Sequence, residues 1–277
     1  MAQNYAQNVL GTIDERFTID SITKPIINNS IRLDYNGANS CTIYNVDVVT
    51  ESNYVRTGAN RFGALVELGT GTQTFVLSQD KAFTFTVDRG NLEDSKMAQE
   101  VDKAVKRQVR EVSVPTTDIY RLNVAATYAA SNSAKTVAAV TNTNAYKSLL
   151  DAQVKVTERK VPKMGRYIYM TETFYALLKR DPEFIRDCDT SYRDLKSGIV
   201  GQVDGATIVT APSSYFVANF AFMVIHKDTL VAPTKFNMIR TLDEVQGIDG
   251  WVAEGRRYYD CFIPKNKGAG IQIHTTA

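Results

Sequence analysis

"VPKMGRYIYMTETFYALLKRD", residues Val161–Asp181, carries three structural signals in close succession. Pro162 and Gly165 predict a turn, the aromatic run after them predicts a short strand, and Thr171 predicts the N-cap of an amphipathic helix. Turns between strands and helices often carry catalytic residues, yet this stretch has no His, Cys or Ser and no glycine fingerprint. Either the catalytic groups lie elsewhere in the chain, or the protein is not an enzyme.

The composition is that of a globular protein. The chain has 277 residues, of which 44% are hydrophobic and 22% charged, enough for one large domain or two ordinary ones. With 32 basic and 30 acidic residues there is no overall basic field, so any contact with nucleic acid needs local clustering. The start "MAQNYAQNVLG" lacks the pattern of a signal peptide, and the longest apolar stretch is too short to cross a bilayer. We therefore expect a soluble intracellular protein without membrane contact.

The candidate sites for chemistry are weak. "VIHKD" places His226 beside two charged residues, but no Ser or Cys nucleophile motif accompanies it. The glycines of "GTGTQT" and "GAG" do not continue into a phosphate-binding loop, and "RDCDTSYRD" lacks the rest of a calcium loop. The cysteines form no CxxC pair and are expected to be free thiols: Cys41, Cys188 and Cys261. We expect no catalytic residue, no metal ligand and no cofactor.

The first third of the sequence predicts an arm and a β-hairpin-like loop that project from the body of the protein. Residues 6–17 have apolar side chains at helical spacing, and residues 21–40 predict an extended arm. From Cys41 the period changes to two, which places Tyr44, Val46 and Val48 on one face of a strand. "FGALVEL", "TFVLS" and "AFTFTVD" predict further strands, and "TESNYVRTGANRFG" predicts a loop. Such a projection is marginally stable alone and is expected to lie on another surface.

A long charged helix is predicted for residues 92–112. Asp102 and Lys106 have the spacing of a favourable i,i+4 pair, and acids alternate with bases along the polar face. We interpret that face as solvated rather than as a stripe that binds nucleic acid. Pro115 is expected to end this helix, and "TTDIYRLNVAATYAAS" predicts a second one.

The rest of the chain predicts an α/β arrangement followed by strands. A helix with buried positions at Ala145, Leu149, Ala152 and Val156 precedes the turn at Pro162. Later strands are expected in "GIVGQVDGATIVTAP" and "FAFMVIH", in a hairpin of "KFNMIRTLD" and "WVAEGRRYYDCFIP" around "EVQGIDG", and in "GAGIQIH". An arm, a β-projection and a long helix expose more surface than one subunit can bury, which favours a protein that associates.

In this order the parts resemble the major capsid proteins of tailed bacteriophages, whose shared fold is called the Hong Kong 97 fold. The resemblance is carried by Val161, Pro162, Gly165 and Arg166, followed by "YIYM" and "TETFYALL". Three further segments are similar to family elements: "GIVGQVDGATIVTAP", "VIHKDTLVAP" and "GWVAEGRRYYDCFIPKNKGAGI". The resemblance extends from about residue 5 to residue 275.

The resemblance implies an α+β fold of four parts. These are an N-arm at residues 1–36, an extended β-loop at 37–91, a peripheral domain with a long spine helix at 92–131 and 233–263, and an axial domain at 132–232 and 264–277. Residues 244–250 are then the peripheral loop near the local threefold axes. Because the sequence begins at the arm, any scaffolding protein is expected to be a separate chain; the alternative is a processed form of a longer chain, against which the initiating Met argues. Lys81 is the one loop lysine and lies near the base of the loop, so no crosslink is expected.

The resemblance further implies a major capsid protein that assembles into pentamers and hexamers of an icosahedral phage head around double-stranded DNA. It is then a structural virion protein, assembled in the bacterial cytoplasm, with scaffolding, portal and decoration proteins as further partners. Lys103, Lys106 and Arg110 are the expected inner-surface DNA contacts, and the expected inter-subunit loop tip holds Tyr54, Arg56 and Arg61. Two alternatives stay open: an encapsulin-like nanocompartment shell, and a small hydrolase centred on His226.

Overall fold

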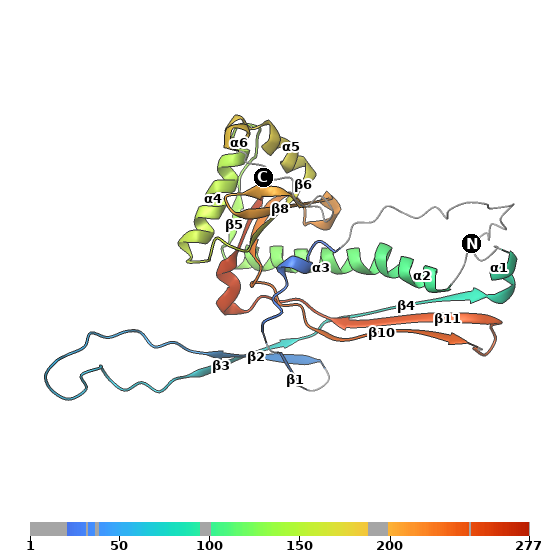
Figure 1. Ribbon diagram of the computed structural model, residues 1–277, viewed down its shortest axis with the longest axis horizontal. Coiled ribbons are helices and arrows are strands. Elements are labelled where there is room, and N and C mark those ends of the chain that lie inside the picture. Colours follow the sequence, from blue (N-terminus) through green and yellow to red (C-terminus); the bar gives the residue numbers. More distant parts are fainter. Residues whose placement is uncertain are drawn as a thin grey trace. The chain divides into compact units, whose positions relative to one another are not determined.

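The computed structural model describes residues 21–31, 33–36, 39–94, 101–187, 199–243 and 245–276. The chain divides into two compact units (Figure 1). Asn29–Ser78 forms the smaller unit, and the residues before and after it form the larger one. Each unit is described by itself.

A six-stranded sheet is the centre of the larger unit, with strand order β5-β12-β9-β6-β8-β7. Its strands are β5 (Lys135–Val137), β6 (Arg166–Thr171), β7 (Ile199–Val203), β8 (Ala206–Ala211), β9 (Phe220–His226) and β12 (Ile271–Thr275). The pairs β5–β12 and β6–β8 are parallel, and the others are antiparallel. The helices α4 (Ala145–Glu158), α5 (Glu172–Arg180) and α6 (Pro182–Asp187) cover one face.

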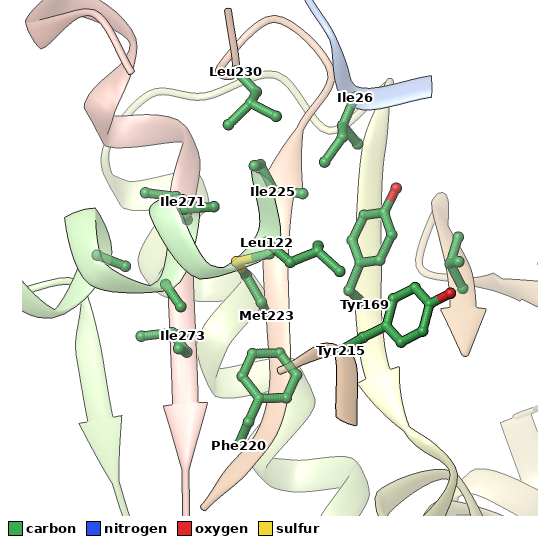
Figure 2. Packing of buried hydrophobic residues seen from close by; sticks show 14 of the residues in the cluster. Ile26, Leu122, Tyr169, Tyr215, Phe220, Met223, Ile225, Leu230, Ile271 and Ile273 are labelled. Atoms are coloured by element: carbon green, nitrogen blue, oxygen red, sulfur yellow. The ribbon is translucent and has the colours of Figure 1, made fainter. Parts of the chain in front are cut away.

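Strand β9 shows why the sheet has a core on both faces. All seven of its residues are buried, and alternate side chains point to opposite faces. Phe222 and Val224 belong to the cluster with α4 and α5. Met223 and Ile225 pack with Leu122 of the helix α3 (Val114–Ser131) on the other face (Figure 2).

A three-stranded antiparallel sheet of order β10-β11-β4 completes the larger unit. It contains β4 (Gln79–Asp88), β10 (Thr234–Asp243) and β11 (Gly250–Tyr259), so the expected late hairpin is confirmed. Arg257 of β11 donates from Nη1 to the carbonyl of Ser113 and the hydroxyl of Thr117, at 3.1 and 3.0 Å. These bonds join the sheet to the long helix.

The long helix does not end at Pro115. It runs as α2 (Val101–Gln108), a π-helical turn at Val109–Ser113 and α3, while α1 (Arg89–Asp94) precedes the undescribed residues 95–100. The expected break was wrong: Pro115 lies at the start of α3, and the helical path from the π-turn continues through it. In the π-turn directly before it, the N–H of Val114 bonds to the carbonyl of Val109, five residues back.

Residues 21–28 are packed, whereas the sequence predicted an extended arm. Ile22 and Ile26 are buried in the core on the α3 side of the large sheet, and a short 3-10 turn covers Lys24–Ile26. Ile27 forms a bridge with Leu230. The predicted helix at residues 6–17 lies outside the described residues. Two further 3-10 turns cover Ser213–Tyr215 and Lys265–Gly270.

The smaller unit is an antiparallel sheet of order β1-β2-β3, with β1 (Asp34–Asn36), β2 (Ser40–Val46) and β3 (Thr70–Val76). Cys41 and Ile43 are buried. Tyr44 and Val46 share the exposed side of β2 and are more than half exposed, while Val48 lies beyond the strand and is 94% exposed. The strand expected in "FGALVEL" was wrong, because residues 62–68 have no ladder partner there.

Candidate functional surfaces

The turn between α4 and β6 is built around one buried arginine. Arg166 is 1% exposed and donates from Nε to the carbonyl of Pro162 at 2.9 Å and from Nη2 to that of Val161 at 2.6 Å. Its Nη1 reaches the carbonyl of Gln153 and the hydroxyl of Thr157, at 3.3 and 3.0 Å. Arg166 thus satisfies two carbonyls of the turn and ties them to the last turns of α4.

Gly165 and Thr171 have the roles in this stretch that the sequence predicted. Gly165 has a φ of +82°, and a Cβ there would lie 2.9 Å from Cδ of Lys227, so the turn requires glycine. Thr171 caps α5, because its hydroxyl accepts the N–H of Phe174 at 3.2 Å. These roles are structural and place no reactive group at the turn.

His226 also makes ordinary strand-end contacts. Its Nδ1 accepts the backbone N–H of Asp228 at 3.2 Å, so Nε2 donates to the carbonyl of Met164 at 2.9 Å. Both ring nitrogens are engaged with backbone groups, as in a structural histidine at a strand end. Within the described residues no three His, Cys, Asp or Glu side chains cluster as metal ligands. In "RDCDTSYRD", Cys188 and the residues after it lie outside the described residues.

The three expected DNA-contact bases lie on α2 and the π-turn. Lys103, Lys106 and Arg110 are all exposed and follow one another at spacings of three and four residues. The expected Asp102–Lys106 pair does not form. Instead Arg107 donates from Nε to Glu111 Oε1 at 2.7 Å, so the acid compensates a neighbouring base.

The expected loop tip is a closed turn with exposed side chains. The N–H of Val55 donates to the carbonyl of Arg61 at 2.9 Å, and Arg61 donates from Nε to the carbonyl of Gly58 at 3.2 Å. Tyr54 packs its ring edge-to-face against Phe62 at 5.0 Å between centroids. Tyr54, Arg56 and Arg61 all face solvent within this unit.

The smaller unit also exposes a row of apolar side chains. Leu65 is 99% exposed, Val48 94% and Phe62 86%. Others are more than half exposed: Tyr44, Val46, Val49, Tyr54, Val55, Val66, Leu68 and Val76. An apolar surface of this density marks an interaction site.

A buried aspartate anchors residues 21–23 to α3, and no local sequence pattern predicts it. Asp118 is 2% exposed and accepts the hydroxyls of Ser21 and Thr23, at 3.0 and 2.5 Å, and the N–H of Ile22 at 2.9 Å. The hydroxyl of Tyr169 in β6 donates to the carbonyl of Ile22 at 2.6 Å. Burial, with nearby Asp118, raises the pKa of Tyr169, so this hydroxyl stays a donor.

No family model and no curated protein matches the chain. Solved structures do. "Capsid structure of the Cyanophage P-SCSP1u" has a TM-score of 0.72 and 12% identity, with 99% of this chain and 93% of that chain covered. "Asymmetric unit of bacteriophage PhiM1 mature capsid" has a TM-score of 0.67 and 12% identity, covering 99% and 92%.

"The head structure of Helicobacter pylori bacteriophage KHP40" has a TM-score of 0.68 and 10% identity, covering 98% of this chain and 94% of that chain. This chain has the fold of phage capsid structures. The expected α+β capsid fold is therefore confirmed along nearly the whole chain. At these identities the likeness concerns the fold, and the function has to be argued from the surfaces.

Among the described residues, no helix is both long and apolar enough to span a membrane.

Proposed function

We propose that this chain is a major capsid protein that assembles with copies of itself into the pentamers and hexamers of an icosahedral phage head. The observation that carries the proposal is the agreement with capsid and head structures over at least nine-tenths of both chains. The role is structural, and the protein is a component of the virion shell.

The exposed side chains of Asn29–Ser78 support association. A unit whose sheet has three short strands, and whose loop residues Val48 and Leu65 are almost fully exposed, is poorly stabilised by its own contacts. Burial of this apolar row against a neighbouring subunit supplies the missing stabilisation, and obligate interfaces reach thousands of Å². The closed turn with Tyr54, Arg56 and Arg61 then lies at an inter-subunit contact.

We further propose that double-stranded DNA is enclosed by the shell and contacts it without sequence preference. Lys103, Lys106 and Arg110 are exposed on one helix, and the described residues offer no ion pair to Lys106 or Arg110. Such bases suit phosphate contacts, which are independent of base sequence. Scaffolding, portal and decoration proteins are the further partners that this role implies, with assembly in the bacterial cytoplasm.

The division into N-arm (1–36), extended loop (37–91), peripheral domain (92–131 and 233–263) and axial domain (132–232 and 264–277) is part of the proposal. Strand β4 pairs with β11 over its whole length, so residues 79–88 of the proposed loop are joined to the late hairpin within the larger unit. Residues 21–28 pack against α3, which ties the end of the arm to the body.

Electron microscopy of the purified full-length chain tests the proposal. Shells of uniform size, formed alone or with a co-expressed scaffolding protein, are expected. A variant without residues 52–62 should fail to form them while keeping a folded larger unit. Monodisperse monomers under every condition would count against a capsid role. Particles filled with one enzyme in place of DNA would favour the encapsulin-like alternative, and an activity lost in His226→Ala with normal shells would favour the hydrolase.

A further inference from the structure

A surface pocket beside the turn at residues 159–165 gathers positive charge. Its volume is about 220 Å³. Arg159, Lys160 and Lys267 line it, and Asp228 is the one carboxylate among its described lining residues. Three cations against one carboxylate leave a net excess of positive charge on the pocket wall.

These cations are not neutralised elsewhere. Arg159 donates from Nη1 to the carbonyl of Ile271 and from Nη2 to Gln272 Oε1, both at 2.9 Å and both neutral acceptors. No carboxylate of the described residues lies within ion-pair distance of Lys160 or Lys267. The guanidinium is thus held in place by bonds that leave its charge uncompensated, while both ammonium groups are available to a ligand.

Some hydrogen-bond acceptors of the lining residues are already used. The carbonyls of Val161 and Pro162, which also line the pocket, accept from Arg166, so a fourth cation lies directly behind them. Nδ1 of His226 accepts the N–H of Asp228. A wall that offers the ammonium groups of Lys160 and Lys267 beside the guanidinium of Arg159 suits an anion.

Size and charge narrow the ligand class. The pocket is smaller than the clefts of about 300–1,000 Å³ that hold drug-sized ligands. A single carboxylate is too few for a hard divalent cation, which takes several oxygen ligands. A compact, doubly charged tetrahedral oxyanion fits both the volume and the charge.

We propose that this pocket binds a phosphate group, with Arg159, Lys160 and Lys267 as its ligands. The proposal goes beyond the capsid role and does not depend on it. Free inorganic phosphate and the backbone phosphate of nucleic acid share this chemistry, so the source of the group is settled by separate arms of the test.

The test is calorimetric titration of the full-length protein with inorganic phosphate, with ionic strength held constant by sodium chloride. We expect saturable binding at one site per chain. Lys160→Asn and Lys267→Gln should each weaken it at least about tenfold, because each removes a charge-assisted hydrogen bond. Asn suits position 160, where φ is +62°.

Lys163→Gln is the matched control, since Lys163 lies in the same turn but outside the pocket lining and pairs with Asp204 at 3.5 Å. It should bind phosphate as the unmodified protein does. Absence of saturable heat, or equal affinity in all three variants, would overturn the proposal. With the site established, a short DNA duplex that displaces phosphate identifies backbone phosphate as a ligand, and a duplex that does not identifies the free ion.

Discussion

Arg166 donates from Nη2 to the carbonyl of Val161 at 2.6 Å, five residues before it in the turn. With its bonds to Pro162 and Gln153, the guanidinium ties the end of α4 to the start of β6. The buried guanidinium of Arg166 therefore has a structural role in this turn. Its positive charge also lies near the C-terminus of α4, where it offsets the negative end of the helix dipole.

The first prediction concerns that cation. Arg166→Met should lower the free energy of unfolding by about 3 kcal/mol or more, because buried carbonyls then lose their donors at about 1–3 kcal/mol each. Arg166→Lys should recover part of the loss, since one ammonium cannot reach every acceptor. Chemical denaturation of the full-length chain measures both. Arg180→Met, an exposed charge change on α5, is the control and should change little. An Arg166→Met protein as stable as the control would refute the structural role.

The second prediction concerns the anchor of residues 21–23. Asp118→Asn replaces one acceptor oxygen with a donor, so the N–H of Ile22 or the hydroxyl of Thr23 is left without an acceptor. Hydrogen exchange at the amides of residues 22–26 should accelerate at least about tenfold, the factor that about 1.4 kcal/mol of lost protection gives. Mass spectrometry of the exchanged peptides measures this. Asp151→Asn on the exposed side of α4 should leave the exchange unchanged.

Periodicity predicted the elements that bury their apolar side chains within the chain itself. α4 has its four predicted positions buried, β9 is buried throughout, and Thr171 caps α5 as its position before an amphipathic helix implied. In each case the local sequence pattern agrees with the environment in the fold, so the pattern alone predicts the element and its buried face.

The failures have a common physical origin in partners that the local pattern does not contain. Tyr44, Val46 and Val48 alternate like a buried face, yet no part of their own unit covers them. The local rule for helix breakers predicts that the helix ends at Pro115, yet the helix continues through it after the π-turn at Val109–Ser113. The roles of Arg166 and Asp118 depend on acceptors and donors brought together by the fold, from up to 97 residues away for Asp118.

The third prediction is a pH dependence that arises from His274. This side chain is 4% exposed, stacks on Phe222 at 5.0 Å and bonds through Nε2 to the carbonyl of Ala138 at 3.1 Å. Burial lowers its pKa below the ordinary 6.5, Lys155 acts in the same direction, and the bond to Ala138 opposes them. The unfolded chain therefore binds this proton more tightly than the folded chain does.

The stabilisation linked to neutral His274 is thus present above about pH 6.5 and is lost as the pH falls below it. Thermal melting from pH 8 to pH 5 should show a steeper loss in the unmodified protein than in His274→Gln, whose amide can still donate to Ala138 but does not titrate. Titrations that both proteins share cancel in the comparison. Parallel melting curves would contradict the role of His274.

The fourth prediction concerns DNA. Replacing Lys103, Lys106 and Arg110 by Gln should weaken binding to duplexes of any sequence and reduce the salt slope by about 0.9 for each phosphate that is no longer neutralised. Filter binding at several salt concentrations measures the slope. A triple Gln variant of the exposed bases Lys147, Lys179 and Arg180 matches the charge change and should keep the original slope. Equal salt slopes in the two variants would show that Lys103, Lys106 and Arg110 do not contact DNA.

The fifth prediction separates assembly from folding in the smaller unit. Val48 and Leu65 are 94% and 99% exposed, so Val48→Ser with Leu65→Ser removes almost no packing within the chain and should leave its melting unchanged. In a shell the same side chains are expected to be buried against a neighbour, at about 1.5–3 kcal/mol for each. Because every subunit loses this burial free energy, sedimentation and electron microscopy of the serine variant should show unassembled chains in place of particles. Val48→Ile with Leu65→Met keeps the apolar surface and should still assemble. Normal shells from the serine variant would show that these two side chains lie outside the subunit interface.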